Sequence, residues 1–111
     1  MKLRSDDFGD MQPIPEALAF GRPGDGEPCV LAGNRSPHLA WSDLPAGTRS
    51  FALLCVDADA PTSADDVNRS DRRVPASLPR AEFTHWLLVD IAPECRELAA
   101  GSCGVGVVAH G

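Results

Sequence analysis

The sequence predicts a single mostly β domain over residues 1–111, an antiparallel β-sandwich with few short helices. Ten glycines and ten prolines are spread along the chain and leave few stretches long enough for a helix. Short apolar runs lie between them, and turn-forming residues separate these runs. A chain of 11.7 kDa has room for one modest core.

Two apolar runs are the strongest strand candidates, residues 51–56 and residues 86–91. Both are nearly continuous, which is typical of strands that are covered on both faces. Weaker strand candidates are the runs 29–32, 38–41 and 105–108. Residues 94–100 are the only predicted helix, of one or two turns, beginning after Pro93 and ending at Gly101.

Two connections differ in character. Residues 44–48 have the chemistry of a tight turn, because Pro45 fixes φ and Gly47 accepts a positive φ. Residues 62–82 form a mostly polar stretch that carries several aspartates and arginines. Loops of that length inside a compact domain are either functional lids or disordered insertions, and the pattern leaves both interpretations open.

The charge balance excludes some classes of function. Sixteen acidic residues against ten basic ones give a net charge of -6, which argues against nucleic-acid binding. No apolar run is long enough to span a bilayer, and the acidic start of the chain does not resemble a signal peptide, so we expect a cytoplasmic location. The four cysteines contain no CxxC pair and are expected to be ordinary thiols, although Cys95 and Cys103 could form a disulfide in an oxidising compartment.

A pair of carboxylates and a histidine could form a polar site. Asp57 and Asp59 follow the first strong strand, and His85 precedes Trp86 at the start of the second. Residues i and i+2 of a strand share a face, so the two carboxylates can converge, and pairing of the two strands would bring His85 within reach. Phe83 or Trp86 would supply an aromatic wall. Alternatively, the aspartates only cap a turn before Pro61.

Other chemistries fit these residues less well. The ligand positions of an EF-hand loop are not filled after Asp57. A zinc or manganese site on Asp57, Asp59 and His85 has suitable ligand types, but no diagnostic spacing supports it. We therefore expect no metal and no cofactor. His38 and His110 have no acidic residue close by in sequence, and such a histidine is more often a surface or hydrogen-bonded core residue.

Four motifs, taken in order, resemble the phosphatidylethanolamine-binding proteins, and most closely their bacterial branch called Raf kinase inhibitor-like. They are GNRSPHLAW at 33–41, LPAGTRSFAL at 44–53, DADAP at 57–61 and FTHW at 83–86. The resemblance implies two antiparallel sheets with a small anion-binding pocket at one end. It assigns that pocket to Asp57, Asp59, Ala60, Pro61, His85 and Trp86. Ala58 stands where the family motif has proline, which we expect to be tolerated.

The resemblance implies a non-enzymatic protein that binds a small anionic or zwitterionic phosphate ligand. Two alternatives are a regulatory protein that inhibits a kinase or another enzyme, and a weak hydrolase that uses aspartate and His85 as acid and base. Family members continue past the point that corresponds to Gly111, with further strands. A sheet without those strands exposes edges and one side of its core, so we expect a homodimer or association with the missing C-terminal segment.

Overall fold

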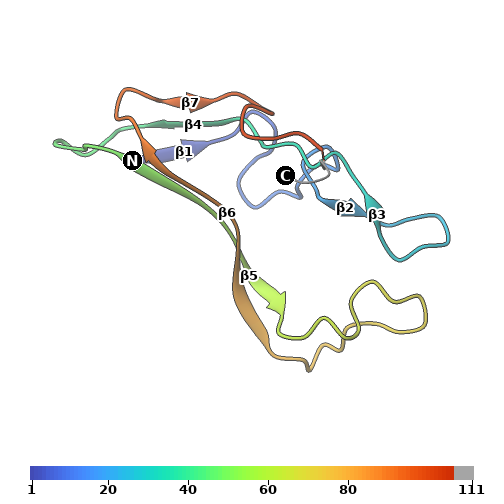
Figure 1. Ribbon diagram of the computed structural model, residues 1–111. Coiled ribbons are helices and arrows are strands. Elements are labelled where there is room, and N and C mark those ends of the chain that lie inside the picture. Colours follow the sequence, from blue (N-terminus) through green and yellow to red (C-terminus); the bar gives the residue numbers. More distant parts are fainter. Residues whose placement is uncertain (107–111) are drawn as a thin grey trace. The chain divides into compact units, whose positions relative to one another are not determined.

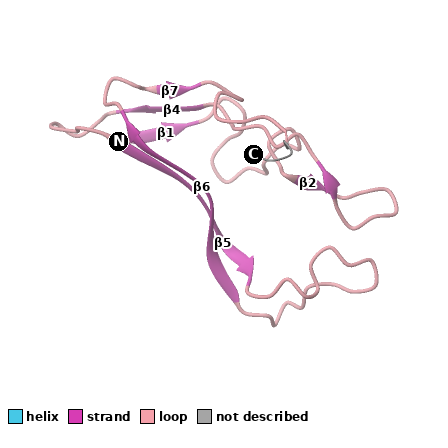
Figure 2. Cartoon of the chain, in the orientation of Figure 1, coloured by secondary structure: helices cyan, strands magenta, loops and turns pink. Residues whose placement is uncertain are grey.

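The computed structural model describes residues 1–106 and divides the chain into two compact units. One unit contains residues 1–48 and the chain from residue 93 onward, and the other contains residues 49–92. Figures 1 and 2 show strands joined by loops and turns, and residues 1–106 contain no helix. Consequently, none of the described residues belongs to a helix that could cross a membrane.

The first unit is built on a three-stranded antiparallel sheet in the order β1-β4-β7. These strands are β1 (Lys2–Arg4), β4 (Leu39–Ser42) and β7 (Glu97–Leu98) (Figure 1). The central strand supplies Leu39, Ala40 and Trp41, which are all buried. A central position gives β4 backbone partners on both edges, so its apolar residues can form the core of this sheet.

A smaller antiparallel pair lies in the same unit, formed by β2 (Gly21–Arg22) and β3 (Val30–Leu31). The chain that leaves β3 passes very close to the segment before β2. A Cβ atom placed on Gly33 would lie 2.3 Å from the carbonyl oxygen of Ala17, so only glycine fits there.

The second unit is one long hairpin of β5 (Phe51–Pro61) and β6 (Arg80–Ile91) (Figure 1). The pairing sets Leu54 opposite Leu87 and Asp57 opposite Phe83. The register shifts at three places along the hairpin: between Phe51 and Leu53, between Cys55 and Val56, and between Asp57 and Ala60. Such irregularities bend a strand pair and turn individual side chains out of strict alternation.

The loop between β5 and β6 is closed at its base and tied together by charge pairs. Thr62 donates a hydrogen bond from its hydroxyl to the carbonyl oxygen of Pro79 over 2.8 Å. Within the loop, Arg72 lies 2.9 Å from Asp71 and 3.5 Å from Asp66. The guanidinium of Arg72 lowers the pKa of Asp71, because it stabilises the carboxylate by a hydrogen bond.

Replacing Arg72 with glutamine is therefore expected to raise the pKa of Asp71 toward the ordinary carboxyl value. Because the pKa of Asp71 is lowered in the folded state, the Asp71–Arg72 pair stabilises the loop fully at pH values above the ordinary carboxyl pKa. This contribution is lost as the pH falls through the lowered pKa. A titration of the Asp71 carboxyl carbon by NMR measures the shift. Arg73→Gln is the control, since Arg73 forms no ion pair among residues 1–106. An equal shift of the Asp71 pKa in both variants would show that Arg72 does not lower it.

The predicted mostly β class with antiparallel sheets is confirmed. A strand is present at each of the predicted runs 29–32, 38–41, 51–56 and 86–91, although three of the strands extend beyond the run, and the turn at 44–48 is present with Gly47 at φ 82°. The predicted helix over 94–100 is wrong, because Glu97 and Leu98 pair with β4 instead. A seven-residue segment gains more from that pairing than from an isolated helical turn.

Two further boundaries differ from the prediction. The polar connection ends at residue 79 rather than 82, since β6 begins at Arg80. Of the weak strand candidate 105–108, Val105 and Gly106 belong to no strand, and the rest lies outside the described residues. Strands β1 and β2 were not predicted, because one leucine between two charged residues, or two residues alone, are too short to give an apolar pattern.

Candidate functional site

The β5–β6 hairpin brings Asp57 and His85 together. The distance between His85 Nε2 and Asp57 Oδ2 is 3.8 Å, which is too long for a hydrogen bond and within the range of an ion pair when the ring is protonated. The prediction that the two strong strands pair is confirmed, and this pairing accounts for the approach of residues that lie far apart in sequence.

A β-bulge positions the histidine. Cys55 pairs with Trp86 and Val56 pairs with Thr84, so His85 is an extra residue on β6 with no residue opposite it. Bulges commonly aim a side chain in a direction that regular alternation does not allow. The imidazole packs edge-on against the ring of Phe83, with centroids 4.9 Å apart.

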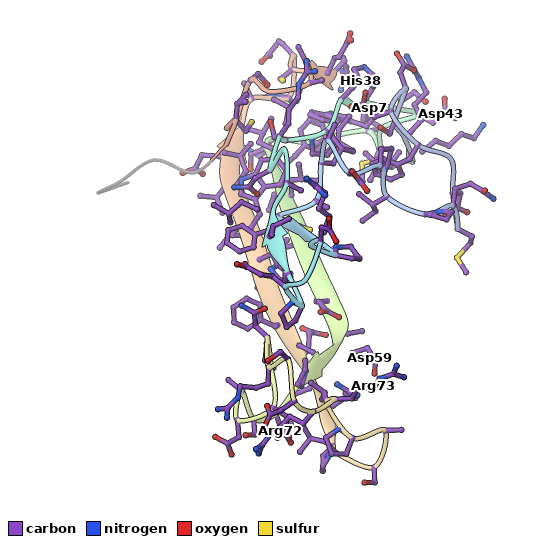
Figure 3. The ribbon with its side chains drawn as sticks, turned by 90° about the vertical axis from the view of Figure 1, so that its right-hand side faces the viewer. Asp7, His38, Asp43, Asp59, Arg72 and Arg73 are labelled. Carbon is purple, nitrogen blue, oxygen red and sulfur yellow. The ribbon has the colours of Figure 1, made fainter. Side chains whose placement is uncertain are left out.

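Asp59 contacts Asp57 through its main chain, and the part of its own carboxylate in the site stays a prediction. Its main-chain N–H donates a hydrogen bond to Asp57 Oδ1 over 2.8 Å, within the irregular stretch between Asp57 and Ala60. Because the strand is irregular there, the rule that residues i and i+2 share a face does not apply. Asp59 lies at the end of the hairpin from which the loop with Arg72 and Arg73 emerges (Figure 3). Its contribution to the site is to hold the carboxylate of Asp57 through the backbone.

The other predicted site residues lie along the same two strands. Ala60 faces Ala81 and Pro61 faces Arg80, beyond the irregular stretch, while Trp86 pairs with Cys55 and is half-buried. Their part in a ligand site stays a prediction. The ring against His85 comes from Phe83, one of the two aromatic residues that the sequence offered for this position.

The Asp57–His85 pair is open to solvent. The His85 side chain is 55% exposed and that of Asp57 is 43% exposed. Asp57 Oδ1 is occupied by the Asp59 amide, so Oδ2 and the imidazole are the groups that can meet a solute. An imidazolium can donate to an anion, and a carboxylate can accept from an ammonium group. Within residues 1–106, no three histidine, cysteine or acidic side chains are arranged to hold a metal ion.

A second polar cluster surrounds His38 in the first unit. His38 is buried, Nδ1 accepts from the main-chain N–H of Asp6 over 2.9 Å, and Nε2 lies 2.9 Å from Glu97 Oε1. The His38 amide donates to Asp7 Oδ2 over 2.6 Å, and Figure 3 shows these two residues side by side. With Nδ1 acting as an acceptor, the neutral ring donates from Nε2 to Glu97. This geometry is that of a hydrogen-bonded core histidine, one of the two roles that the sequence left open for His38.

Sequence reasoning could not find the partners of His38. Asp6, Asp7 and Glu97 lie 32, 31 and 59 residues away along the chain. A shallow hollow of about 550 Å³ lies over the same sheet and contains none of the predicted site residues. It is lined by Lys2, Leu3, Arg4, Ala40, Trp41, Ser42, Arg96 and Glu97.

Antiparallel sheets and a histidine–aspartate pair after a long apolar strand define a β-rich protein with an open polar site. Comparison with known families then shows to which family this β-rich protein belongs. A model described as phosphatidylethanolamine-binding protein matches residues 4–110, and the chain belongs to this family. The predicted family is thereby confirmed.

Curated relatives support the same conclusion. The chain is 37% identical over 110 residues to the UPF0098 protein YbhB of Escherichia coli. The aligned residues make up 98% of this chain and 54% of YbhB. It is 30% identical over 94 residues to a UPF0098 protein of Methanothermobacter thermautotrophicus, covering 85% of this chain and 44% of the relative. The chain thus spans about half the length of the curated relatives that it matches.

Proposed function

We propose that the chain is a non-enzymatic binding protein for small phosphate-containing anions or zwitterions, and that Asp57 and His85 form its ligand site. The observation that carries the proposal is the 3.8 Å approach of these two side chains on a bulged hairpin. Membership of a family described as phosphatidylethanolamine-binding supports a ligand of this chemistry.

In the proposed site, His85 and Asp57 recognise different parts of the ligand. The imidazolium of His85 donates to a phosphate oxygen, and charge-assisted hydrogen bonds of this kind are stronger than neutral ones. Asp57 Oδ2 accepts from the ammonium group of a zwitterion, while the Asp59 amide keeps Oδ1 in place. An anion without an ammonium group uses His85 alone and meets repulsion from Asp57.

Binding suits the site better than hydrolysis. General acid–base catalysis needs groups within hydrogen-bond reach of the reacting atoms, and electrostatic catalysis works best where water is excluded. Both side chains are about half exposed, so a bound ester would stay in contact with water. The weak hydrolase is therefore the less favoured candidate.

An NMR titration of the 111-residue chain with phosphoethanolamine and with inorganic phosphate tests the proposal. We expect the ring signals of His85 to shift at millimolar ligand, and those of Phe83 to follow because the two rings are in contact. His38 is the internal control, since both of its ring nitrogens already have partners. The proposal fails if neither compound moves the His85 signals, or if His38 moves as much as His85.

Regulation through a protein partner is a second candidate, favoured by the loop of residues 62–79. Its base is closed at Thr62 and Pro79, and its charge pairs hold an exposed surface that includes Val67. Ordered exposed loops often carry binding functions. A variant with a Gly-Ser linker in place of residues 63–78 separates the two candidates: regulation requires that it lose its protein partner while phosphate still shifts His85.

A further inference from the structure

The ring of His38 contacts two different kinds of partner. Nδ1 accepts a hydrogen bond from the main-chain N–H of Asp6 over 2.9 Å, and Nε2 lies 2.9 Å from Glu97 Oε1. A ring that accepts at Nδ1 and donates at Nε2 is neutral. His38 is buried, so both contacts lie inside the first unit rather than at its surface. The arrangement is therefore that of a buried histidine in its neutral state.

Uptake of a proton would affect the two sides of this ring differently. On the Nε2 side, the carboxylate of Glu97 accepts a hydrogen bond from the neutral ring and from the charged ring alike, so that contact is kept. On the Nδ1 side, the new N–H would point at the main-chain N–H of Asp6, which can only donate. The hydrogen bond between Asp6 and Nδ1 therefore cannot persist when the ring is protonated.

A replacement acceptor lies close to Nδ1. Asp6 Oδ2 is 3.7 Å from this nitrogen and belongs to the residue whose main chain makes the present hydrogen bond. The Asp6 side chain is 66% exposed and is paired with that of Arg4, which is 64% exposed. Exposed pairs of this kind contribute little to stability, so the carboxylate can turn toward His38 at small cost. Asp6 can thus change from a main-chain donor to a side-chain acceptor.

The charged groups within ion-pair distance of the ring are both acidic in the part of the chain that the structure describes. They are the carboxylates of Asp6, from the segment after β1, and of Glu97, on β7. From the same segment, Asp7 accepts a hydrogen bond from the His38 main chain, and Arg4 is paired with Asp6. β4 itself has no charged residue. A positive charge on the ring would therefore meet two carboxylates and no cation.

We propose that His38 and Asp6 form a pH-dependent switch that changes how the chain after β1 is attached to the sheet. The neutral ring binds the Asp6 main chain, and the protonated ring binds the Asp6 carboxylate instead. Histidine is the side chain that ordinarily changes charge between about pH 5 and 8. Because β1 lines the hollow over this sheet, the exchange would also alter that surface. The switch lies in the first unit and does not depend on the ligand site proposed for the β5–β6 hairpin.

An NMR titration of the 111-residue chain between about pH 8 and pH 5 tests the switch. We expect the Nδ1 signal of His38 to change from that of a bare ring nitrogen to that of a protonated one. The coupling between the Asp6 amide nitrogen and Nδ1, which reports their hydrogen bond, should be present at high pH and lost at low pH. The Trp41 amide, which donates to Arg96 in the same unit, should keep its folded signal throughout.

Three results of this titration would overturn the proposal. One is a ring that stays neutral over the whole range. Another is a protonated ring whose Asp6 amide remains bound to it. The third is loss of the folded Trp41 signal together with the Asp6 coupling, since that result indicates unfolding of the sheet rather than an exchange of partners.

Asp6→Ala and Asp43→Ala are a matched pair of variants. Each removes an exposed carboxylate that is paired with a cation of β1, but only Asp6 lies beside the ring. We expect Asp6→Ala to keep β1 in place at high pH and to release it at low pH, where the Cα signals of residues 2–4 move to those of an unfolded chain. Asp43→Ala should keep β1 in place at both pH values. The same response of both variants at low pH would contradict the switch.

Discussion

Replacing His38 with alanine is expected to destabilise the unit built on β1, β4 and β7 by about 2–4 kcal/mol. His38 is only 7% exposed, and its ring satisfies the Asp6 amide on one side and Glu97 on the other. Alanine would leave both groups without this partner and open a void beside β4. The loss comes mainly from the void that removal of the buried ring leaves, whereas Glu97, whose side chain is 62% exposed, can bond water instead.

Amide hydrogen exchange of the Trp41 main chain measures this effect, since that N–H donates to the carbonyl oxygen of Arg96 within the same unit. A loss of 2 kcal/mol corresponds to roughly 30-fold faster exchange. Lys2→Ala serves as the control, because Lys2 and Asp43 form an exposed ion pair on the same sheet, worth no more than about 1 kcal/mol. Similar exchange rates in the two variants would show that His38 does not hold the sheet.

The strands that could be predicted from the sequence are those that contain a recognisable pattern of apolar residues. Continuous apolar runs identified the centres of β5 and β6, and Pro45 with Gly47 identified a turn. The ends of the long hairpin were missed because Asp57 to Pro61 and Arg80 to Thr84 are mainly polar or small. Such residues enter a strand when a neighbouring strand pairs with their backbone, and no local pattern reports that pairing.

The site was predictable only in outline. Strand pairing brings His85 to Asp57, as alternation and strand proximity suggested. The sequence does not show where β-bulges occur, however, and two of them determine the geometry of the site. At one bulge His85 has no residue opposite it on β5. At the other, the main-chain N–H of Asp59 donates a hydrogen bond to Asp57. The helix expected over residues 94–100 failed for a related reason, because the partner strand that captures Glu97 lies more than 50 residues away.

Replacing His85 with alanine is expected to weaken phosphate binding by about tenfold to a hundredfold, the value of one charge-assisted hydrogen bond. The prediction rests on the proposed ligand site, in which the imidazole is the hydrogen-bond donor of the pair. His85 is 55% exposed and lies in a bulge, so its removal should leave the free energy of unfolding nearly unchanged. Affinity is measured by calorimetry, and stability by urea unfolding of the same samples.

Asp57→Asn distinguishes recognition of a zwitterion from simple anion attraction. The amide removes a negative charge 3.8 Å from the imidazole but keeps an oxygen that can accept from the Asp59 amide. Inorganic phosphate should then bind as well as before or better, since the repulsion from Asp57 is gone. Phosphoethanolamine should lose affinity, because its ammonium group no longer meets a carboxylate. If both ligands respond to Asp57→Asn in the same direction and to the same extent, Asp57 does not contact the ligand and the proposed division of charges is wrong.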